Sequence, residues 1–204
     1  MKRIIDYLVE TYAPHTILLY GSYADGSNNT GSDFDALLIT DNVCARHDGR
    51  MIDDVPLDVF IYHTSKFEGE VDCRDFLQLH DAALLLDSRG MGLRLKNEVF
   101  AYIEQMPQKS PVEKLHMVEW CEKMLLRAAR GDAEGYFRWH WLLSDSLEIY
   151  FELLGERYLG PKKALARLKA QDPETFECYS QALSTFEYEA ARSWIDRLRS
   201  RLGQ

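Results

Sequence analysis

The sequence predicts an α+β fold in two parts: a mixed β-sheet flanked by helices over residues 1–106, then an antiparallel helical bundle over residues 110–204. Three observations support this prediction. Apolar runs of strand length occur in the first part, and helical spacing of apolar residues dominates the second. Between them, the segment Met106-Pro107-Gln108-Lys109-Ser110-Pro111 interrupts both patterns with two prolines. We therefore predict a domain boundary at this segment.

In the first part, helical and strand-like segments alternate. Residues 2–12 have apolar positions at helical spacing, and Pro14 ends the predicted helix. The polar segment 41–54 is predicted to be a loop that links two antiparallel strands. The predicted strands are residues 16–20, 34–40, 55–62 and 82–86. A short helix is predicted through residues 66–67, with Thr64 as its cap, and further helices are predicted at residues 74–79 and 91–106.

The second part is predicted to contain helices only. Ser110 and Glu113 have the spacing of a capping box, with Pro111 at the first helical position. That helix is expected to stop near Gly131, and Asp132 to cap the next one. Three more helices are predicted over residues 162–170, from residue 173 onward and over residues 187–202. Five helices with short connections predict an antiparallel bundle.

The composition is that of a soluble globular protein of 204 residues, with 46% hydrophobic and 28% charged residues. No apolar run is long enough to span a bilayer, and the acid-containing N-terminus does not resemble a signal peptide. The cysteines lack a Cys-x-x-Cys pair, which favours reduced thiols over a zinc site or a disulfide scaffold. They are Cys44, Cys73, Cys121 and Cys178. We therefore expect a cytoplasmic protein.

The net charge of −9 bears on the partners of the protein. Non-specific binding of nucleic acid depends on clusters of Lys and Arg. An acidic chain therefore disfavours a polynucleotide partner, and it favours a small cationic molecule or another protein.

Gly21 and Ser22 close the first predicted strand. Glycine permits backbone angles that other residues avoid and lets a phosphate group approach the main chain. Ser22 adds a hydroxyl donor and can open a short helix whose first amide groups point at an anion. We therefore expect a phosphate-binding turn at this position.

Three aspartates are placed to share a cation. Asp33 and Asp35 stand at the head of the second predicted strand, where residues i and i+2 project to the same face about 6 to 7 Å apart. Asp58 is the only charged residue in the apolar run 55–62, and a buried carboxylate requires a metal or a charged neighbour. Magnesium prefers oxygen ligands and substrate phosphates. The three residues together predict a Mg²⁺-nucleotide site.

The pattern of Gly21-Ser22, ten residues, Asp33-Phe34-Asp35 and a later apolar strand with Asp58 resembles the signature of DNA polymerase beta-like nucleotidyltransferases. The spacing is most similar to that of small bacterial members, the antibiotic (aminoglycoside-type) and minimal nucleotidyltransferases. The resemblance covers the first part of the chain. One departure is Asp25, which follows Ala24 where many small members have an arginine.

The resemblance implies an enzyme with Mg²⁺ as cofactor and a nucleoside triphosphate, ATP in the first place, as donor. Asp33, Asp35 and Asp58 would then be catalytic residues and metal ligands, and Gly21 and Ser22 would bind the terminal phosphates. The expected reaction is attack of an acceptor hydroxyl on the α-phosphorus, with pyrophosphate as leaving group.

Residues of the second part are expected to assist nucleotide binding and proton transfer. Residues 158–163 resemble a Tyr-x-Gly-x-Lys element in the helical tails of antibiotic-type members, which implies that Lys163 or Lys162 faces the nucleotide phosphates. The proton of the acceptor hydroxyl is expected to pass to Asp58 or to an acid of the bundle, such as Glu148 or Asp145. The residues do not decide between these bases.

The expected acceptor is a small hydroxylated molecule such as an aminoglycoside-like compound. Two alternatives are adenylylation of a partner protein, and a degenerate module that binds nucleotide or protein without catalysis. Neither nucleic acid nor a membrane is expected as a partner.

An aromatic-rich segment at residues 136–141 is compatible with a homodimer. Tyr136, Phe137, Trp139 and Trp141 fit a core or a partner interface better than a base-stacking surface. His140 is expected to be a hydrogen-bonded core residue.

Overall fold

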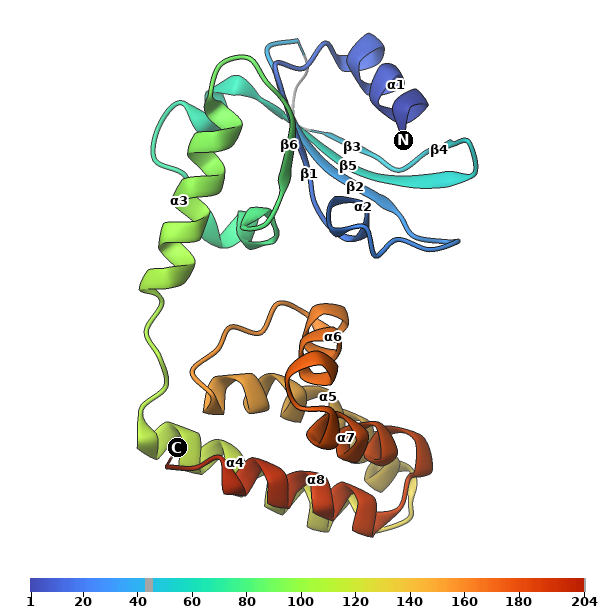
Figure 1. The fold of residues 1–204 in the computed structure, drawn as a ribbon, viewed down its shortest axis with the longest axis vertical. Helices are drawn as coiled ribbons and strands as arrows, with labels where there is room; N and C mark the ends of the chain where they lie inside the picture. The colour runs from blue at the N-terminus through green and yellow to red at the C-terminus, as the bar shows by residue number, and fades with distance from the viewer. Residues whose placement is uncertain (43–45, 204) are drawn as a thin grey trace. The chain divides into compact units, whose positions relative to one another are not determined.

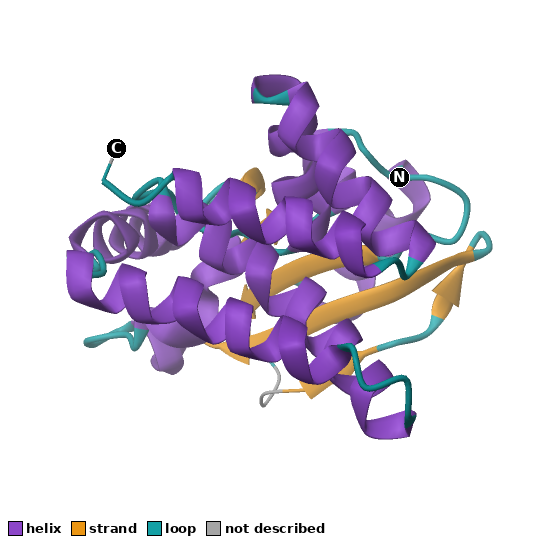
Figure 2. Cartoon of the chain, turned by 90° about the horizontal axis from the view of Figure 1, so that it is seen from below, coloured by secondary structure: helices purple, strands orange, loops and turns teal. Residues whose placement is uncertain are grey.

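The computed structural model describes residues 1–42 and 46–203 and divides into two compact units, the first unit (Met1–Met106) and the second unit (Pro107–Gln204), both drawn in Figure 1. Among the described residues, every strand belongs to the first unit (orange in Figure 2). The predicted α+β class is therefore confirmed. Cys44 lies outside the described residues. Within the described part of the chain, no helix is both long and apolar enough to cross a membrane.

A mixed sheet forms the centre of the first unit. Its strands in the described residues are β1 (Thr16–Leu19), β2 (Phe34–Thr40), β3 (Arg46–Asp48), β4 (Met51–Ile52), β5 (Val55–His63) and β6 (Ala83–Asp87). They lie in the order β3-β5-β2-β1-β6, and β4 pairs with β5. β2 and β5 are parallel, whereas β1 is antiparallel to both of its neighbours.

Helices cover both faces of this sheet. On β2, Leu38 packs into a core with Leu8, and its neighbour Leu37 packs into a second core with Val99. This is the alternation that a strand with two covered faces requires. The helices are α1 (Lys2–Tyr12), α2 (Ser22–Asp25), the 3-10 helices η1 (Thr64–Phe67) and η2 (Cys73–Leu79), and α3 (Met91–Gln105). Figure 1 shows α1 and α3 on opposite sides of the sheet.

The prediction for residues 41–54 is wrong in two respects. The flanking strands β2 and β5 are parallel, and the segment contains the short strands β3 and β4, which pair with β5 in antiparallel fashion. Asp48 at the end of β3 is 3% exposed and accepts hydrogen bonds from the hydroxyls of Tyr7 (2.8 Å) and Tyr12 (2.6 Å). The polar segment is therefore held in the sheet by polar contacts with α1, which its own pattern does not reveal.

The second unit consists of helices in its described residues. The predicted capping box of Ser110 and Glu113 is present at the start of the first of these helices. Trp194 and Tyr179 lie at the centre of the core, with ring centroids 4.6 Å apart. The helices are α4 (Pro111–Ala128), α5 (Ala133–Leu153), α6 (Pro161–Gln171), α7 (Pro173–Thr185) and α8 (Tyr188–Ser200).

The aromatic segment of α5 divides between core and surface. Trp139 is buried, whereas Phe137 and Trp141 are exposed. His140 is also exposed and contacts the ring of Phe186, so its prediction as a core residue is wrong. The periodicity of an amphipathic helix identifies a buried stripe, but a histidine at its margin can lie on either side.

Candidate active site

Asp35 and Asp58 lie side by side in the sheet. They are register partners on the parallel strands β2 and β5, so their side chains project to the same face. The third strand of the site is β1, because the backbone N–H of Tyr20, the residue after β1, donates to the carbonyl oxygen of Asp35 (3.0 Å). Burial raises the pKa of Tyr20, and the nearby carboxylates of Asp58 and Asp35 raise it further. The strand ends therefore bring two carboxylates and a buried tyrosine together.

The turn after β1 packs directly against Asp35. Gly21 has φ +65°, and a Cβ atom at this position would lie 2.2 Å from Oδ2 of Asp35. Only a residue without a side chain permits this approach. Ser22 then begins α2, which has four residues, and the carbonyl of Gly21 accepts from the N–H of Ala24 (3.1 Å).

Asp25, the last residue of α2, and Asp33 both lie in the connection between β1 and β2. Asp33 is exposed and directly precedes β2, which begins at Phe34. Asp25 accepts hydrogen bonds from the backbone N–H (2.9 Å) and the hydroxyl (2.5 Å) of Ser27. The acid at position 25 therefore stabilises the turn that follows α2.

Asp58 has a partner that the sequence analysis missed. The Nε2 atom of His47 lies 2.6 Å from Oδ1 of Asp58. His47 belongs to β3 and lies in the polar segment 41–54, for which the sequence predicts a loop. The Asp-Asp pair at 53 and 54 forms the tight turn between β4 and β5 with positive φ at both residues, but it does not mark β3.

The donor set fits a magnesium ion. Among the described residues, no group of three or more His, Cys, Asp and Glu side chains is arranged to hold a metal ion. Magnesium is usually bound by one or two carboxylates and completes its shell with water and substrate phosphates. Asp35 and Asp58 supply such a pair of carboxylates, and Gly21 allows the turn after β1 to pack directly against Asp35.

Comparison with known proteins assigns this sheet to a family. Residues 1–86 match the family described as Nucleotidyltransferase domain. These residues form a nucleotidyltransferase domain. The match confirms the suspected superfamily for residues 1–86. No curated protein matches the sequence.

Two solved structures resemble the chain at low sequence identity. A nucleotidyltransferase-like protein from Exiguobacterium sibiricum 255-15 is 14% identical, with a TM-score of 0.41, and the match covers 98% of this chain and 73% of that protein. The spectinomycin adenyltransferase AAD(9) from Enterococcus faecialis, solved with ATP and spectinomycin, is 10% identical, with a TM-score of 0.38, and the match covers 100% of this chain and 96% of that protein.

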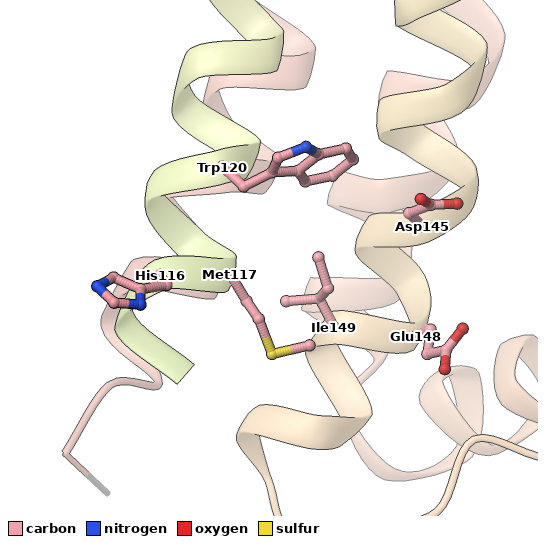
Figure 3. Close-up of a pocket in the computed structure, with 6 residues that line it drawn as sticks. All are labelled: His116, Met117, Trp120, Asp145, Glu148 and Ile149. Carbon is pink, nitrogen blue, oxygen red and sulfur yellow. The ribbon is translucent and has the colours of Figure 1, made fainter. Parts of the chain in front are cut away.

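Outside the nucleotidyltransferase domain, the second unit has a cavity of about 380 Å³ between α4 and α5. Trp120 and Met117 line it from α4, and Asp145, Glu148 and Ile149 line it from α5 (Figure 3). The indole N–H of Trp141 donates to Asp145 (2.6 Å). Burial raises the pKa of Glu148, and the neighbouring carboxylates of Glu152 and Asp145 raise it further. The cavity thus combines an apolar wall with two carboxylates.

The predicted lysines also belong to the second unit. Lys163 is half-buried and Lys162 is exposed, both in the first turn of α6. Of the predicted site residues, the structure brings Gly21, Asp35 and Asp58 together in the nucleotidyltransferase domain.

Proposed function

We propose that the chain is a Mg²⁺-dependent nucleotidyltransferase that moves a nucleoside monophosphate from a nucleoside triphosphate, in the first place ATP, to a hydroxyl group. The observation that supports this most strongly is the register pairing of Asp35 with Asp58 beside a turn that closes onto Asp35 at Gly21. Two carboxylates on one face, next to a glycine turn, fit the binding of a metal-nucleotide complex.

The residues of the chain would act as follows. Asp35 and Asp58 would hold the metal, with Asp33 just before β2 as a further carboxylate, and the turn at Gly21 and Ser22 would bind the terminal phosphates. The chemistry that Mg²⁺ supplies when bound is neutralisation of charge on the triphosphate and on the departing pyrophosphate.

The acceptor hydroxyl attacks the α-phosphorus, a new P–O bond forms, and the bond to pyrophosphate breaks. The proton of the acceptor hydroxyl would pass to Asp58. Lys163 or Lys162 would contact the nucleotide phosphates.

We further propose a small hydroxylated amine, such as an aminoglycoside-like compound, as the acceptor. Two features favour a cation. The net charge is −9, and the carboxylates of Asp145 and Glu148 line the same cavity as the indole of Trp120. Carboxylates and an aromatic face both attract ammonium groups. Adenylylation of a protein, or nucleotide binding without transfer, would give different outcomes in the experiment below.

The donor site is tested first, by unfolding the protein with each of four nucleoside triphosphates, with and without Mg²⁺. A ligand at about 100 times its dissociation constant stabilises the folded state by about 2.7 kcal/mol. We expect a Mg²⁺-dependent shift with ATP that is lost in Asp35→Asn. Asp54→Asn is the matched control, because Asp54 is an exposed acid of the same unit in a tight turn that asparagine tolerates.

The transfer step is tested with α-labelled ATP and a panel of hydroxylated amines. We expect label on an amine compound and release of pyrophosphate, both abolished by Asp35→Asn. Label found on a co-expressed protein alone would reject the small-molecule acceptor. Nucleotide binding without any pyrophosphate release would favour the non-catalytic module.

A further inference from the structure

His47 occupies a defined position beside the candidate metal site. On β3 it is the register partner of Phe60 on β5, and Asp58 lies two residues before Phe60 on the same face. Diagonal neighbours of this kind are within reach of aromatic and other long side chains. The distance of 2.6 Å between Nε2 of His47 and Oδ1 of Asp58 is that of a short hydrogen bond. Because an ionised carboxylate can only accept, Nε2 carries the hydrogen in this pair.

The side chain of His47 is 48% exposed, and its imidazole ring has one further ring contact. Its centroid lies 4.9 Å from that of the Phe60 ring, at an interplanar angle of 45°. On another side, a Cβ atom at Gly49 would lie 3.2 Å from Cε1 of His47, so that a larger residue would crowd the ring. His47 is therefore positioned by Asp58 and Phe60, and Gly49 leaves room for the ring.

The strand that presents His47 is itself anchored. The next residue, Asp48, is buried and accepts from Tyr7 and Tyr12 of α1, and also from the backbone N–H of Arg50 (3.2 Å). A buried carboxylate with three donors resists displacement, because any shift of the strand would leave it without partners. Hydrogen bonds to Asp48, rather than apolar packing, therefore hold β3 in place.

We propose that His47 is a positioning residue that orients the carboxylate of Asp58 for the metal-nucleotide complex. The proposal rests on the proposed function. Hydrogen bonds to one oxygen of a ligating carboxylate fix its plane and hence the direction of the other oxygen. Loss of such a partner weakens metal affinity or activity by about 10- to 100-fold in metalloproteins.

The test measures binding of Mn²⁺, a spectroscopic substitute for Mg²⁺, to the full chain by electron paramagnetic resonance. We expect His47→Ala to weaken Mn²⁺ binding about 10- to 100-fold while its unfolding transition matches that of the wild type. His47→Gln retains a donor at a similar distance and is expected to restore most of the affinity. His63→Ala is the matched control, because His63 is an exposed histidine at the end of β5 whose Nδ1 pairs with the hydroxyl of Ser65.

A second measurement separates orientation from general damage. In assays of pyrophosphate release, His47→Ala is expected to lower kcat with a smaller change in KM, and His47→Gln to recover kcat. Mn²⁺ affinity in His47→Ala that equals or exceeds that of the wild type would overturn the proposal.

Asp35→Asn and Asp58→Asn distinguish this result from failure of the proposed function. If both variants bind Mn²⁺ as the wild type does, or the wild type binds none, the metal site itself is wrongly assigned and His47 has no such role. If both lose binding while His47→Ala keeps it, only the role of His47 is refuted.

Discussion

The close approach of Gly21 to Asp35 predicts a large effect of a single methyl group. Gly21 has φ +65° and ψ −154°, a backbone region that is nearly restricted to glycine and costs other residues about 1–3 kcal/mol. In Gly21→Ala the new Cβ would lie 2.2 Å from Oδ2 and 2.9 Å from Cγ of Asp35, so the turn or the carboxylate must move. Overpacking of this kind adds about 1–3 kcal/mol. We therefore expect Gly21→Ala to lower the free energy of unfolding by about 2–6 kcal/mol.

The chain offers a matched control at Gly26. It has φ +74°, but a Cβ atom there would meet nothing within 4 Å. Gly26→Ala should therefore cost only the backbone strain of a left-handed residue, about 1–2 kcal/mol. The difference between the two variants contains the contact with Asp35 together with the difference in backbone strain between the two positions.

The assay is urea unfolding followed by two signals. All four tryptophans lie in the second unit, at positions 120, 139, 141 and 194, so their fluorescence follows that unit, whereas circular dichroism follows both. Gly21→Ala is expected to shift the dichroism transition.

The decisive comparison is a double-mutant cycle. Asp35→Ala removes Oδ2 and Cγ and leaves its own Cβ, 3.3 Å from the new methyl group. In that background the cost of Gly21→Ala should fall toward that of Gly26→Ala, a coupling of about 1 kcal/mol or more. Equal costs of Gly21→Ala in both backgrounds would refute the inferred contact.

Three further changes test other contacts of the fold. Although burial raises the pKa of Asp48, hydrogen bonds from Tyr12, Tyr7 and Arg50 outweigh it, so the folded pKa lies below the usual value of about 3.9. The ionised carboxylate therefore stabilises the first unit at pH values above its usual pKa, and this stabilisation is lost as the pH falls through the folded pKa. Asp48→Asn should unfold at a lower urea concentration near neutral pH, and its unfolding midpoint should depend less on pH in the acid range. Ser146→Ala removes the buried acceptor of the Trp194 indole N–H (2.8 Å) and should cost about 1–3 kcal/mol in the fluorescence transition. Ser110→Ala removes the capping box of α4 and should cost about 1 kcal/mol. For each of these three variants, an unchanged midpoint of urea unfolding would contradict the assigned contact.

Local signals were sufficient to predict most helices and several strands. The helix α1 ends at Tyr12 as its spacing and Pro14 predicted, and α4 begins with the capping box of Ser110 and Glu113. Such signals lie within a few residues of the structure they determine, because a helix forms its hydrogen bonds between neighbours along the chain.

Pairing between distant strands could not be predicted in this way. The order of β2 and β5 along the chain does not reveal that they are parallel, nor that Asp35 and Asp58 are register partners. The strand β3 has no apolar alternation to identify it. Its one buried side chain, Asp48, is stabilised by tyrosine hydroxyls 36 and 41 residues away in the sequence.

The amino-acid sequence by itself determined the residue types of the candidate site: a glycine and a serine after one apolar strand, and aspartates at the head or within two others. The tertiary structure decided which of these residues meet. It placed Gly21 against Asp35 and brought His47 to Asp58. The physical reason is that residue chemistry is a local property, whereas these contacts follow from strand register and from the burial of Asp48 against α1, which exist only once the chain has folded.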